Sequence, residues 1–252
     1  MIHFVGAGCG APDLITVRGA ALIRQADAVI YAGSLVSPAL LHDTKPDCEI
    51  HNSAKMTLGD VIAVMARVEA RGGMTVRLHT GDPSVYGAIR EQMDRLDALH
   101  IPYKICPGVS SFCGAAAALK AEYTLPGVSQ SVVITRMAGR TPVPELESIR
   151  SFAAHRATMV IFLSAGLTQQ LQAELLAGGY PPDTPAAIVY KASWPDEKIV
   201  RCTAGTLHQT AEAAGISNHA LIAVGDFLGD DYELSKLYDP AFTTGFRQGT
   251  SE

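Results

Sequence analysis

The segment His79–Gly87 contains the side chains with the clearest capacity for chemistry in this chain: an imidazole, a carboxylate, hydroxyl groups and two glycines. Gly81 and Gly87 allow a close approach of the backbone to a ligand, or a positive φ angle. Asp82 places a carboxylate near backbone N–H groups that the start of a helix leaves unpaired. The segment is therefore suited to binding a small ligand. A capped loop in which Asp82 serves only as a helix N-cap is the alternative, since Gly-Asp-Pro is common in turns.

The elements that must position this segment are a strand before it and a helix after it. Met74–Leu78 has the β-branched and apolar content of a buried strand, and Ala88–Met93 has a helical pattern. In an open α/β sheet such strand-to-helix turns lie at the carboxyl ends of the strands, where ligands bind. Two further turns of this kind, Gly6–Asp13 and Pro107–Ser111, follow other predicted strands.

The composition of the 252 residues indicates a folded protein, with 48% hydrophobic and 18% charged side chains. The net charge of −5 argues against nucleic acid as a partner, but allows a small anionic ligand held by a local basic cluster. The first residues do not resemble a secretion signal and no apolar run is long enough to span a bilayer, which predicts a cytoplasmic protein. The scattered cysteines and histidines lack the spacing of a metal site or a disulfide framework.

The alternation of strands and helices predicts an α/β fold with two domains and a ligand cleft between them. The predicted parts are an N-terminal α/β domain over residues 1–120, a linker over 121–130, a C-terminal α/β domain over 131–240 and a tail over 241–252. A parallel sheet covered on both faces is expected in such a chain. Predicted helices include Ser34–Leu41, Thr57–Arg71, Val143–Ala154 and Leu167–Ala177, and predicted strands include Ala28–Tyr31, Thr158–Leu163, Pro185–Tyr190 and Ala220–Val224.

The first glycine-rich turn also suggests a dinucleotide-dependent oxidoreductase. Its glycines, Gly6, Gly8 and Gly10, have the spacing Gly-x-Gly-x-Gly in place of the Gly-x-Gly-x-x-Gly typical of dinucleotide binding. The strand Ala28–Tyr31 is followed by Ala-Gly-Ser, so the acidic residue expected to bind a ribose hydroxyl is missing. These details argue against NAD as the ligand.

Taken together, the three turns resemble the signature of the tetrapyrrole methyltransferase family. These are the class III S-adenosylmethionine-dependent methyltransferases of sirohaem and cobalamin synthesis. The motifs are Gly6–Gly19, Gly81–Gly87 and Pro107–Ser111, and the resemblance extends from Ile2 to about Asp226. Within the family, the segment Val29–Val36 is similar to the precorrin-4 C11-methyltransferases, including the cobalt-precorrin-4 enzymes.

This resemblance implies a homodimeric enzyme that transfers the methyl group of S-adenosylmethionine to C11 of precorrin-4 or its cobalt form and releases S-adenosylhomocysteine. Because the sulfonium is already activated, alignment of the two reactants supplies on the order of 7–11 kcal/mol of the barrier without a catalytic nucleophile. One departure is that Cys9–Pro12 replaces the Pro-Gly-Asp-Pro of many relatives, so the first turn lacks an acid. Cys9 is expected to be a small loop residue, with a nucleophile as the alternative. The catalytic base is not identified.

The cofactor contacts that the resemblance implies are mostly small or apolar residues. Carried onto this chain they are Pro12, Thr80, Gly81, Asp82, Val85, Ser110, Ser111, Leu163, Ala187 and Ala192. Leu163 and Ala187 lie in apolar strands, so membership of the core is their alternative role. The carboxylates of a tetrapyrrole require cationic or hydrogen-bonding partners, for which Arg18, His79 and Arg136 are candidates. The alternatives are solvated surface arginines and a strand-end histidine.

Three other functions compete with this interpretation. The first is a methyltransferase that acts on another carbon of a corrin precursor or on uroporphyrinogen III. The second is the dinucleotide-dependent oxidoreductase, which requires the missing acid. The third is a tetrapyrrole carrier or chelatase without methyl transfer, which leaves the three cofactor-type turns unexplained.

Overall fold

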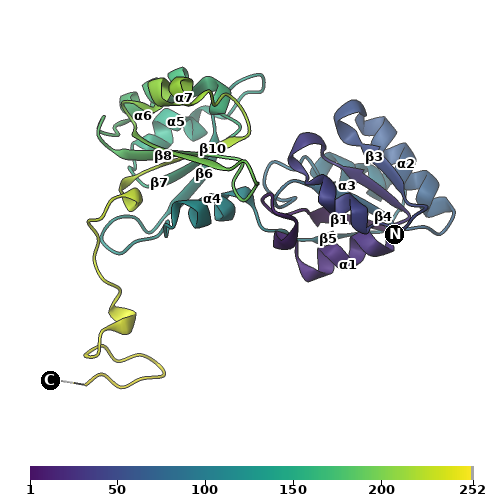
Figure 1. Ribbon diagram of the computed structural model, residues 1–252, viewed down its shortest axis with the longest axis horizontal. Helices are drawn as coiled ribbons and strands as arrows, with labels where there is room; N and C mark the ends of the chain where they lie inside the picture. The colour runs from purple at the N-terminus through teal and green to yellow at the C-terminus, as the bar shows by residue number, and fades with distance from the viewer. Residues whose placement is uncertain (251–252) are drawn as a thin grey trace. The chain divides into compact units, whose positions relative to one another are not determined.

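The computed structural model describes residues 1–250. The chain divides into two compact units (Figure 1). The first consists of Met1–Ala118 together with Lys191–Lys198, and the second consists of Leu119–Tyr190 and the chain from Ile199 onward. The described parts of both units are α/β, as predicted.

The first unit contains a five-stranded sheet in the order β3-β2-β4-β1-β5, in which every strand pair is parallel. Its strands are β1 (Ile2–Gly6), β2 (Ala28–Tyr31), β3 (Glu49–Asn52), β4 (Thr75–His79) and β5 (Tyr103–Cys106). The order places β1 between β4 and β5, so the three strands that precede the predicted turns are neighbours. Gly6 lies opposite His79 at the carboxyl ends of β1 and β4.

Apolar residues on both faces of this sheet pack against three helices, α1 (Val17–Gln25), α2 (Leu58–Ala70) and α3 (Arg90–Ala98). A fourth helix, α4 (Ser111–Leu119), follows the third turn. Ile2, Phe4 and Ile30 pack against Val61 and Met65 of α2 and Leu96 of α3. Val5, Val29, Val76 and Leu78 form a second layer with Ile23 of α1 and Leu40.

The second unit contains a mixed sheet in the order β6-β7-β10-β8-β9. Its strands are β6 (Val132–Arg136), β7 (Thr158–Phe162), β8 (Pro185–Tyr190), β9 (Lys198–Thr203) and β10 (Ala220–Val224). β6 and β7 are parallel, whereas β10 is antiparallel to both β7 and β8. The helices α5 (Ile149–Ala153), α6 (Thr168–Gly178) and α7 (Leu207–Ala214) cover one face of the sheet (Figure 1). Leu171, Leu175 and Leu207 from these helices bury Met159, Ile188 and Ile222.

Three predicted elements differ from the structure for local reasons. The predicted helix Val143–Ala154 is reduced to a 3₁₀ turn and the short α5, which begins after the cap formed when Ser148 accepts a hydrogen bond from the Ser151 amide. Ser34–Leu41 forms parts of two 3₁₀ turns, and α3 begins at Arg90 because Ala88 has a positive φ of 49°. β3 was not predicted, since Glu49–Asn52 contains one apolar residue.

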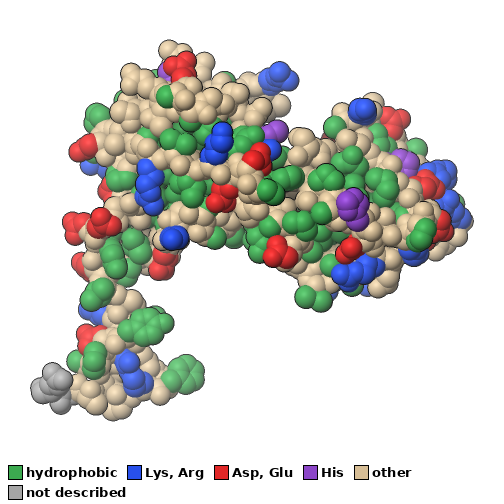
Figure 2. All heavy atoms as spheres, in the orientation of Figure 1, with side chains coloured by type: hydrophobic (Ala, Val, Ile, Leu, Met, Phe, Trp, Pro, Cys, Tyr) green, Lys and Arg blue, Asp and Glu red, His purple; other side chains and the backbone are tan. Residues whose placement is uncertain are grey.

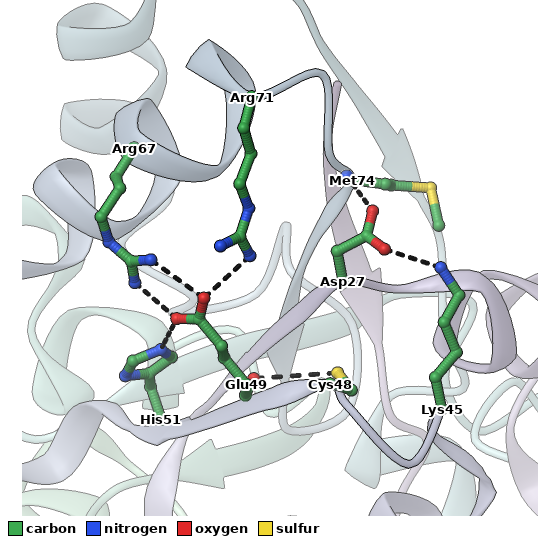
Figure 3. A network of polar contacts seen from close by, with 8 residues as sticks. All are labelled: Asp27, Lys45, Cys48, Glu49, His51, Arg67, Arg71 and Met74. Carbon is green, nitrogen blue, oxygen red and sulfur yellow. Dashed lines mark hydrogen bonds and ion pairs between the residues drawn. The ribbon is translucent and has the colours of Figure 1, made fainter.

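Charged contacts attach β3 to its neighbours (Figure 3). The Glu49 carboxylate accepts hydrogen bonds from Arg67 at 2.9 and 2.5 Å and from Arg71 at 2.8 Å, both on the last turns of α2, and contacts His51 at 3.2 Å. The Arg67 guanidinium holds the pKa of Glu49 well below its usual range. This network lies at the amino ends of the strands, so it stabilises the sheet edge away from the predicted turns.

The C-terminal segment after Phe227 contains neither α-helix nor strand within its described residues. It exposes several large apolar side chains, visible as hydrophobic atoms on that segment in Figure 2: Tyr232, Leu234, Leu237, Tyr238, Phe242 and Phe246. Residues 251–252 of the predicted tail lie outside the described residues.

Candidate functional site

The first two predicted turns are hydrogen-bonded to each other at the carboxyl ends of β1 and β4. The Ala7 amide donates to the His79 carbonyl at 2.7 Å. Gly8 and Gly81 form an isolated β-bridge, with N–O distances of 3.3 and 2.9 Å in the two directions. The chain after β1 and the chain after β4 therefore form one continuous backbone surface.

Glycine is required where all three turns approach one another. A Cβ atom added at Gly6 would lie 2.5 Å from the Gly81 carbonyl oxygen and 2.6 Å from Gly108 Cα. A Cβ atom added at Gly108 would lie 2.7 Å from Gly6 Cα. Gly81 itself has a φ of +63°, a conformation that strains residues with a side chain. The three glycines thus bring the three backbone segments together without intervening side chains.

Asp82 links the second turn to the third. Its carboxylate accepts hydrogen bonds from the Ser84 amide at 2.8 Å and from the Ser84 hydroxyl at 2.5 Å, and also from the Gly108 amide at 2.7 Å. Burial raises the pKa of Asp82, but these hydrogen bonds outweigh burial and hold its pKa below the usual value. The interpretation of Asp82 as a helix N-cap is wrong, because α3 begins at Arg90 and its N-cap is Ile89.

The loop between Asp82 and α3 has a strained backbone. Tyr86 and Ala88 have positive φ angles of 55° and 49°, although neither is glycine. The Gln92 side-chain amide of α3 donates to the Ala88 carbonyl at 3.0 Å and so holds this conformation. Strained residues of this kind persist where surrounding contacts fix them, and they cluster at functional sites.

Arg77 is buried in the core and contacts Gln92, the residue that holds the Ala88 backbone. It is only 7% exposed on the face of β4 that packs beneath α2 and α3. Its Nε donates to Gln92 Oε1 at 3.2 Å and its Nη1 donates to the Ile30 carbonyl at 3.1 Å. Burial lowers its pKa to about 10, so Arg77 remains charged at neutral pH. No carboxylate among the described residues forms an ion pair with it.

His79 is buried beside this loop and is uncharged. It is 3% exposed, and its ring centroid lies 6.1 Å from that of Phe4. Burial, and secondarily the charge of Arg77, lowers the pKa of His79 to about 3. Within the described part of the chain, its Nε2 atom is buried without a hydrogen-bond partner. Any contact that His79 makes to a ligand is therefore that of a neutral imidazole.

Most of the predicted cofactor residues lie on or beside the three joined turns. Thr80, Gly81, Asp82 and Val85 belong to the second turn, Ser110 and Ser111 to the third, and Pro12 begins a 3₁₀ turn in the first. A Cβ atom added at Gly81 would lie 3.4 Å from Ser110 Cα and from Ser111 N, so the second and third turns touch here. Ala192 lies in the segment Lys191–Lys198, which belongs to the same unit.

Leu163 and Ala187 lie in the second unit and differ sharply from each other. Leu163 follows β7 directly, is 70% exposed and has a positive φ of 53°. Such exposure does not fit the core alternative for Leu163. Ala187 is fully buried in β8 opposite Ala223, a position that fits the core.

The two candidate arginines have different surroundings. Arg18 is exposed on the first turn of α1, and no hydrogen bond or ion pair engages its guanidinium within the described residues. Arg136 donates to the carbonyls of Met137, Thr141 and Pro142 at 3.1, 3.2 and 2.8 Å. Arg18 is thus available to an anionic ligand, whereas Arg136 binds its own loop.

No three or more His, Cys, Asp or Glu side chains are grouped as metal ligands among the described residues. None of the described helices combines the length and apolar character needed to cross a membrane. The joined turns, with their backbone groups and small side chains, form the candidate site.

Comparison with known proteins gives consistent matches along the chain. A family model described as Tetrapyrrole (Corrin/Porphyrin) Methylases matches residues 1–208. The cobalt-precorrin-4 C(11)-methyltransferase of Methanocaldococcus jannaschii is 51% identical over 248 residues, covering 98% of this chain and 96% of that protein. The enzyme of the same name from Priestia megaterium is 47% identical and covers 98% of both chains.

Two solved structures of named methyltransferases also match this chain. A cobalamin biosynthetic enzyme, cobalt precorrin-4 methyltransferase, matches with a TM-score of 0.89 and 46% identity, covering 91% of this chain and 96% of that one. A uroporphyrin-III C-methyltransferase from Thermus thermophilus, complexed with S-adenosylhomocysteine, matches with a TM-score of 0.75 and 27% identity. It covers 90% of this chain and 98% of that one.

Proposed function

This chain belongs to the tetrapyrrole (corrin/porphyrin) methylase family, and we propose that it transfers a methyl group from S-adenosylmethionine to C11 of precorrin-4 or cobalt-precorrin-4. The observation that carries this proposal is the identity of 47–51% over nearly the full length with relatives named for that reaction. The joined glycine turns support it, because they provide the backbone surface that such a cofactor requires.

The residues of the first unit fit S-adenosylmethionine. Gly6 and Gly108 let the three turns pack backbone against backbone, so the turns present backbone groups and small side chains at the carboxyl ends of the strands. The residues of this unit that would hold the cofactor are Thr80–Asp82, Val85, Ser110, Ser111, Pro12 and Ala192. Leu163 is a further candidate that the family resemblance implies. Ala187 has its side chain fully buried in β8, which fits its alternative role in the core. When bound, S-adenosylmethionine supplies a methyl group activated by its sulfonium centre.

The work of the protein in this mechanism is to orient the reactants. Asp82 fixes the second and third turns against each other, and the Arg77–Gln92 contacts fix the loop that follows. Arg18 would bind a substrate carboxylate, because its guanidinium is exposed and unengaged. His79 would offer a neutral hydrogen bond from Nε2. Such positioning accounts for catalysis without a nucleophilic side chain.

A homodimer, which the family resemblance implies, and a cytoplasmic location complete the proposal. Each has its own test: sedimentation of the purified protein for the dimer, and fractionation of the source cells for the location.

The first test of the function is calorimetric titration with S-adenosylhomocysteine beside NADH. Micromolar binding of the first and none of the second supports the proposed cofactor, whereas the reverse result favours the oxidoreductase. The second test supplies ¹³C-methyl-labelled S-adenosylmethionine with precorrin-4 or cobalt-precorrin-4 and locates the label by NMR. Label at C11 supports the proposal. Label at another carbon, methylation of uroporphyrinogen III alone, or binding of a tetrapyrrole without methylation assigns one of the alternatives.

A further inference from the structure

The segment Lys191–Lys198 connects β8 to β9 of the second unit but packs with the first unit. Two of its residues have left-handed backbone conformations although they are not glycine. Lys191 has a φ of 46° and Ser193 has a φ of 65°. Such strain at neighbouring positions requires compensating contacts.

Some of those contacts lie within the segment Lys191–Lys198 itself, which we call the hook. The Trp194 amide donates to the Lys191 carbonyl at 3.0 Å, and the Ser193 amide donates to Glu197 Oε2 at 2.6 Å. Lys191 Nζ lies 2.7 Å from Asp196 Oδ2 and 5.6 Å from the centroid of the Trp194 ring. The hook therefore presents Ser193 and Trp194 in a fixed orientation.

The hook contacts three consecutive residues of the first glycine turn, Cys9–Ala11. The Ala11 amide donates to Ser193 Oγ at 3.0 Å, and Ser193 Oγ lies 3.4 Å from Cys9 Sγ. Between them, Gly10 has a φ of 156°, and a Cβ atom added there would overlap the Trp194 ring and lie 2.8 Å from the Ala192 carbonyl oxygen. Cys9–Ala11 is thus held from one side by a hydroxyl and an indole.

We propose that Ser193 and Trp194 are positioning residues for the cofactor, acting through Ala11 and Gly10 to hold the first turn in its binding conformation. This inference rests on the proposed function, since the turn matters for binding only if Pro12, directly after Ala11, contacts S-adenosylmethionine. No motif in the sequence indicated either residue. Their role follows from contacts between positions far apart in the chain.

Ser193 and Trp194 would strengthen ligand binding because they preorganise the first turn. Without the Ser193 hydroxyl, the Ala11 amide loses its acceptor and the turn occupies other conformations. The ligand must then select the competent fraction, which weakens its apparent affinity in proportion. One lost hydrogen bond corresponds to roughly a threefold to tenfold rise in Kd.

The test compares variants by calorimetric titration with S-adenosylhomocysteine. Ser193→Ala removes the hydroxyl and keeps the backbone strain, whereas Ser193→Gly removes both. We expect both variants to bind roughly threefold to tenfold more weakly, with KM for S-adenosylmethionine raised and kcat near that of the unaltered protein. Trp194→Ala should weaken binding, and Trp194→Phe should restore most of it by keeping an aromatic cover on Gly10. Ser131→Ala, at an exposed serine of the second unit, is the matched control and should change nothing.

Fluorescence supplies a readout that a purely structural role would not change. Trp194 is the only tryptophan of the chain, so tryptophan emission reports on the hook alone. S-adenosylhomocysteine should shift the emission of the unaltered protein. The inference is overturned if the emission is unchanged while the ligand binds, or if the folded Ser193 variants bind as tightly as the unaltered protein. Failure of the unaltered protein itself to bind overturns the proposed function instead, and the inference with it.

Discussion

Asp82 and Gly108 lie on different turns of the first sheet, and a 2.7 Å hydrogen bond from the Gly108 amide to the Asp82 carboxylate joins them. Asp82→Ala removes this bond and both bonds to Ser84, so the two turns separate. We expect S-adenosylhomocysteine to bind at least tenfold more weakly, with about 1–3 kcal/mol lost from the free energy of unfolding. Calorimetry and urea unfolding measure the two effects. Asp82→Asn, which keeps one acceptor oxygen, should lose less of both; equal affinity in folded Asp82→Ala would remove Asp82 from the site.

Gly6 and Gly108 leave no space for a methyl group between the turns. Gly6→Ala and Gly108→Ala force backbone segments apart, and overpacking of this kind costs about 1–3 kcal/mol. Both variants should melt at lower temperature and lose most of their affinity for S-adenosylhomocysteine. Gly245→Ala is the control, because no atom lies within 4 Å of a Cβ added there. Normal binding by Gly108→Ala would mean that the turns need not touch.

Arg77 and Gln92 form a buried contact at 3.2 Å that can be dissected by a double-mutant cycle. Gln92→Leu leaves the Arg77 charge with fewer acceptors and should cost about 2–3 kcal/mol of unfolding free energy. Arg77→Met combined with Gln92→Leu replaces the polar pair by apolar groups, which should cost less than the sum of the single changes. Urea unfolding of the four proteins gives the coupling. Strict additivity would show that the pair is energetically independent.

His79 makes stability depend on pH in a defined direction. The folded protein protonates it only near its pKa of about 3, whereas the unfolded chain does so below about 6.5. Between these values the unfolded state binds one more proton, so the free energy of unfolding falls with falling pH by about 1.4 kcal/mol per unit. His79→Gln should remove this contribution. From pH 7 to pH 5, the unaltered protein should lose about 2 kcal/mol more than the variant, and parallel curves would contradict a neutral buried His79.

Leu163 combines 70% exposure with a left-handed backbone, so stability and binding should respond differently to its replacement. Leu163→Gly relieves a strain of about 1 kcal/mol, partly offset by the greater freedom of the unfolded chain. We expect unchanged or slightly higher stability together with weaker binding of S-adenosylhomocysteine. Leu234→Gly, at another exposed leucine without a positive φ, should not alter binding. Full affinity in Leu163→Gly would show that this side chain does not contact the cofactor.

The sequence predicted those elements whose local pattern and burial agree. Ala220–Val224 is a strand with the predicted bounds, and the helix predicted at Thr57–Arg71 is α2 with Thr57 in its capping box. β3 was missed because ion pairs hold it, and ion pairs between distant residues leave no periodic pattern.

The candidate site was only partly predictable for the same reason. Glycine turns after strands indicated a candidate ligand site, since that inference needs only local order along the chain. The bond from Gly108 to Asp82 and the contacts of Ser193 with Ala11 depend on tertiary structure. The alternative role of Asp82 as an N-cap is wrong because Ala88 interrupts the helical pattern with a positive φ, which the residue type does not reveal.

The return of Lys191–Lys198 to the first unit has a consequence for the order of synthesis. The N-terminal residues leave the ribosome first and domains tend to fold as units, yet this unit lacks one of its parts until residue 198 has been made. Throughout that interval the Ala11 amide has no Ser193 hydroxyl to bind. The nascent chain therefore lacks this contact on its first turn until most of its length has been made.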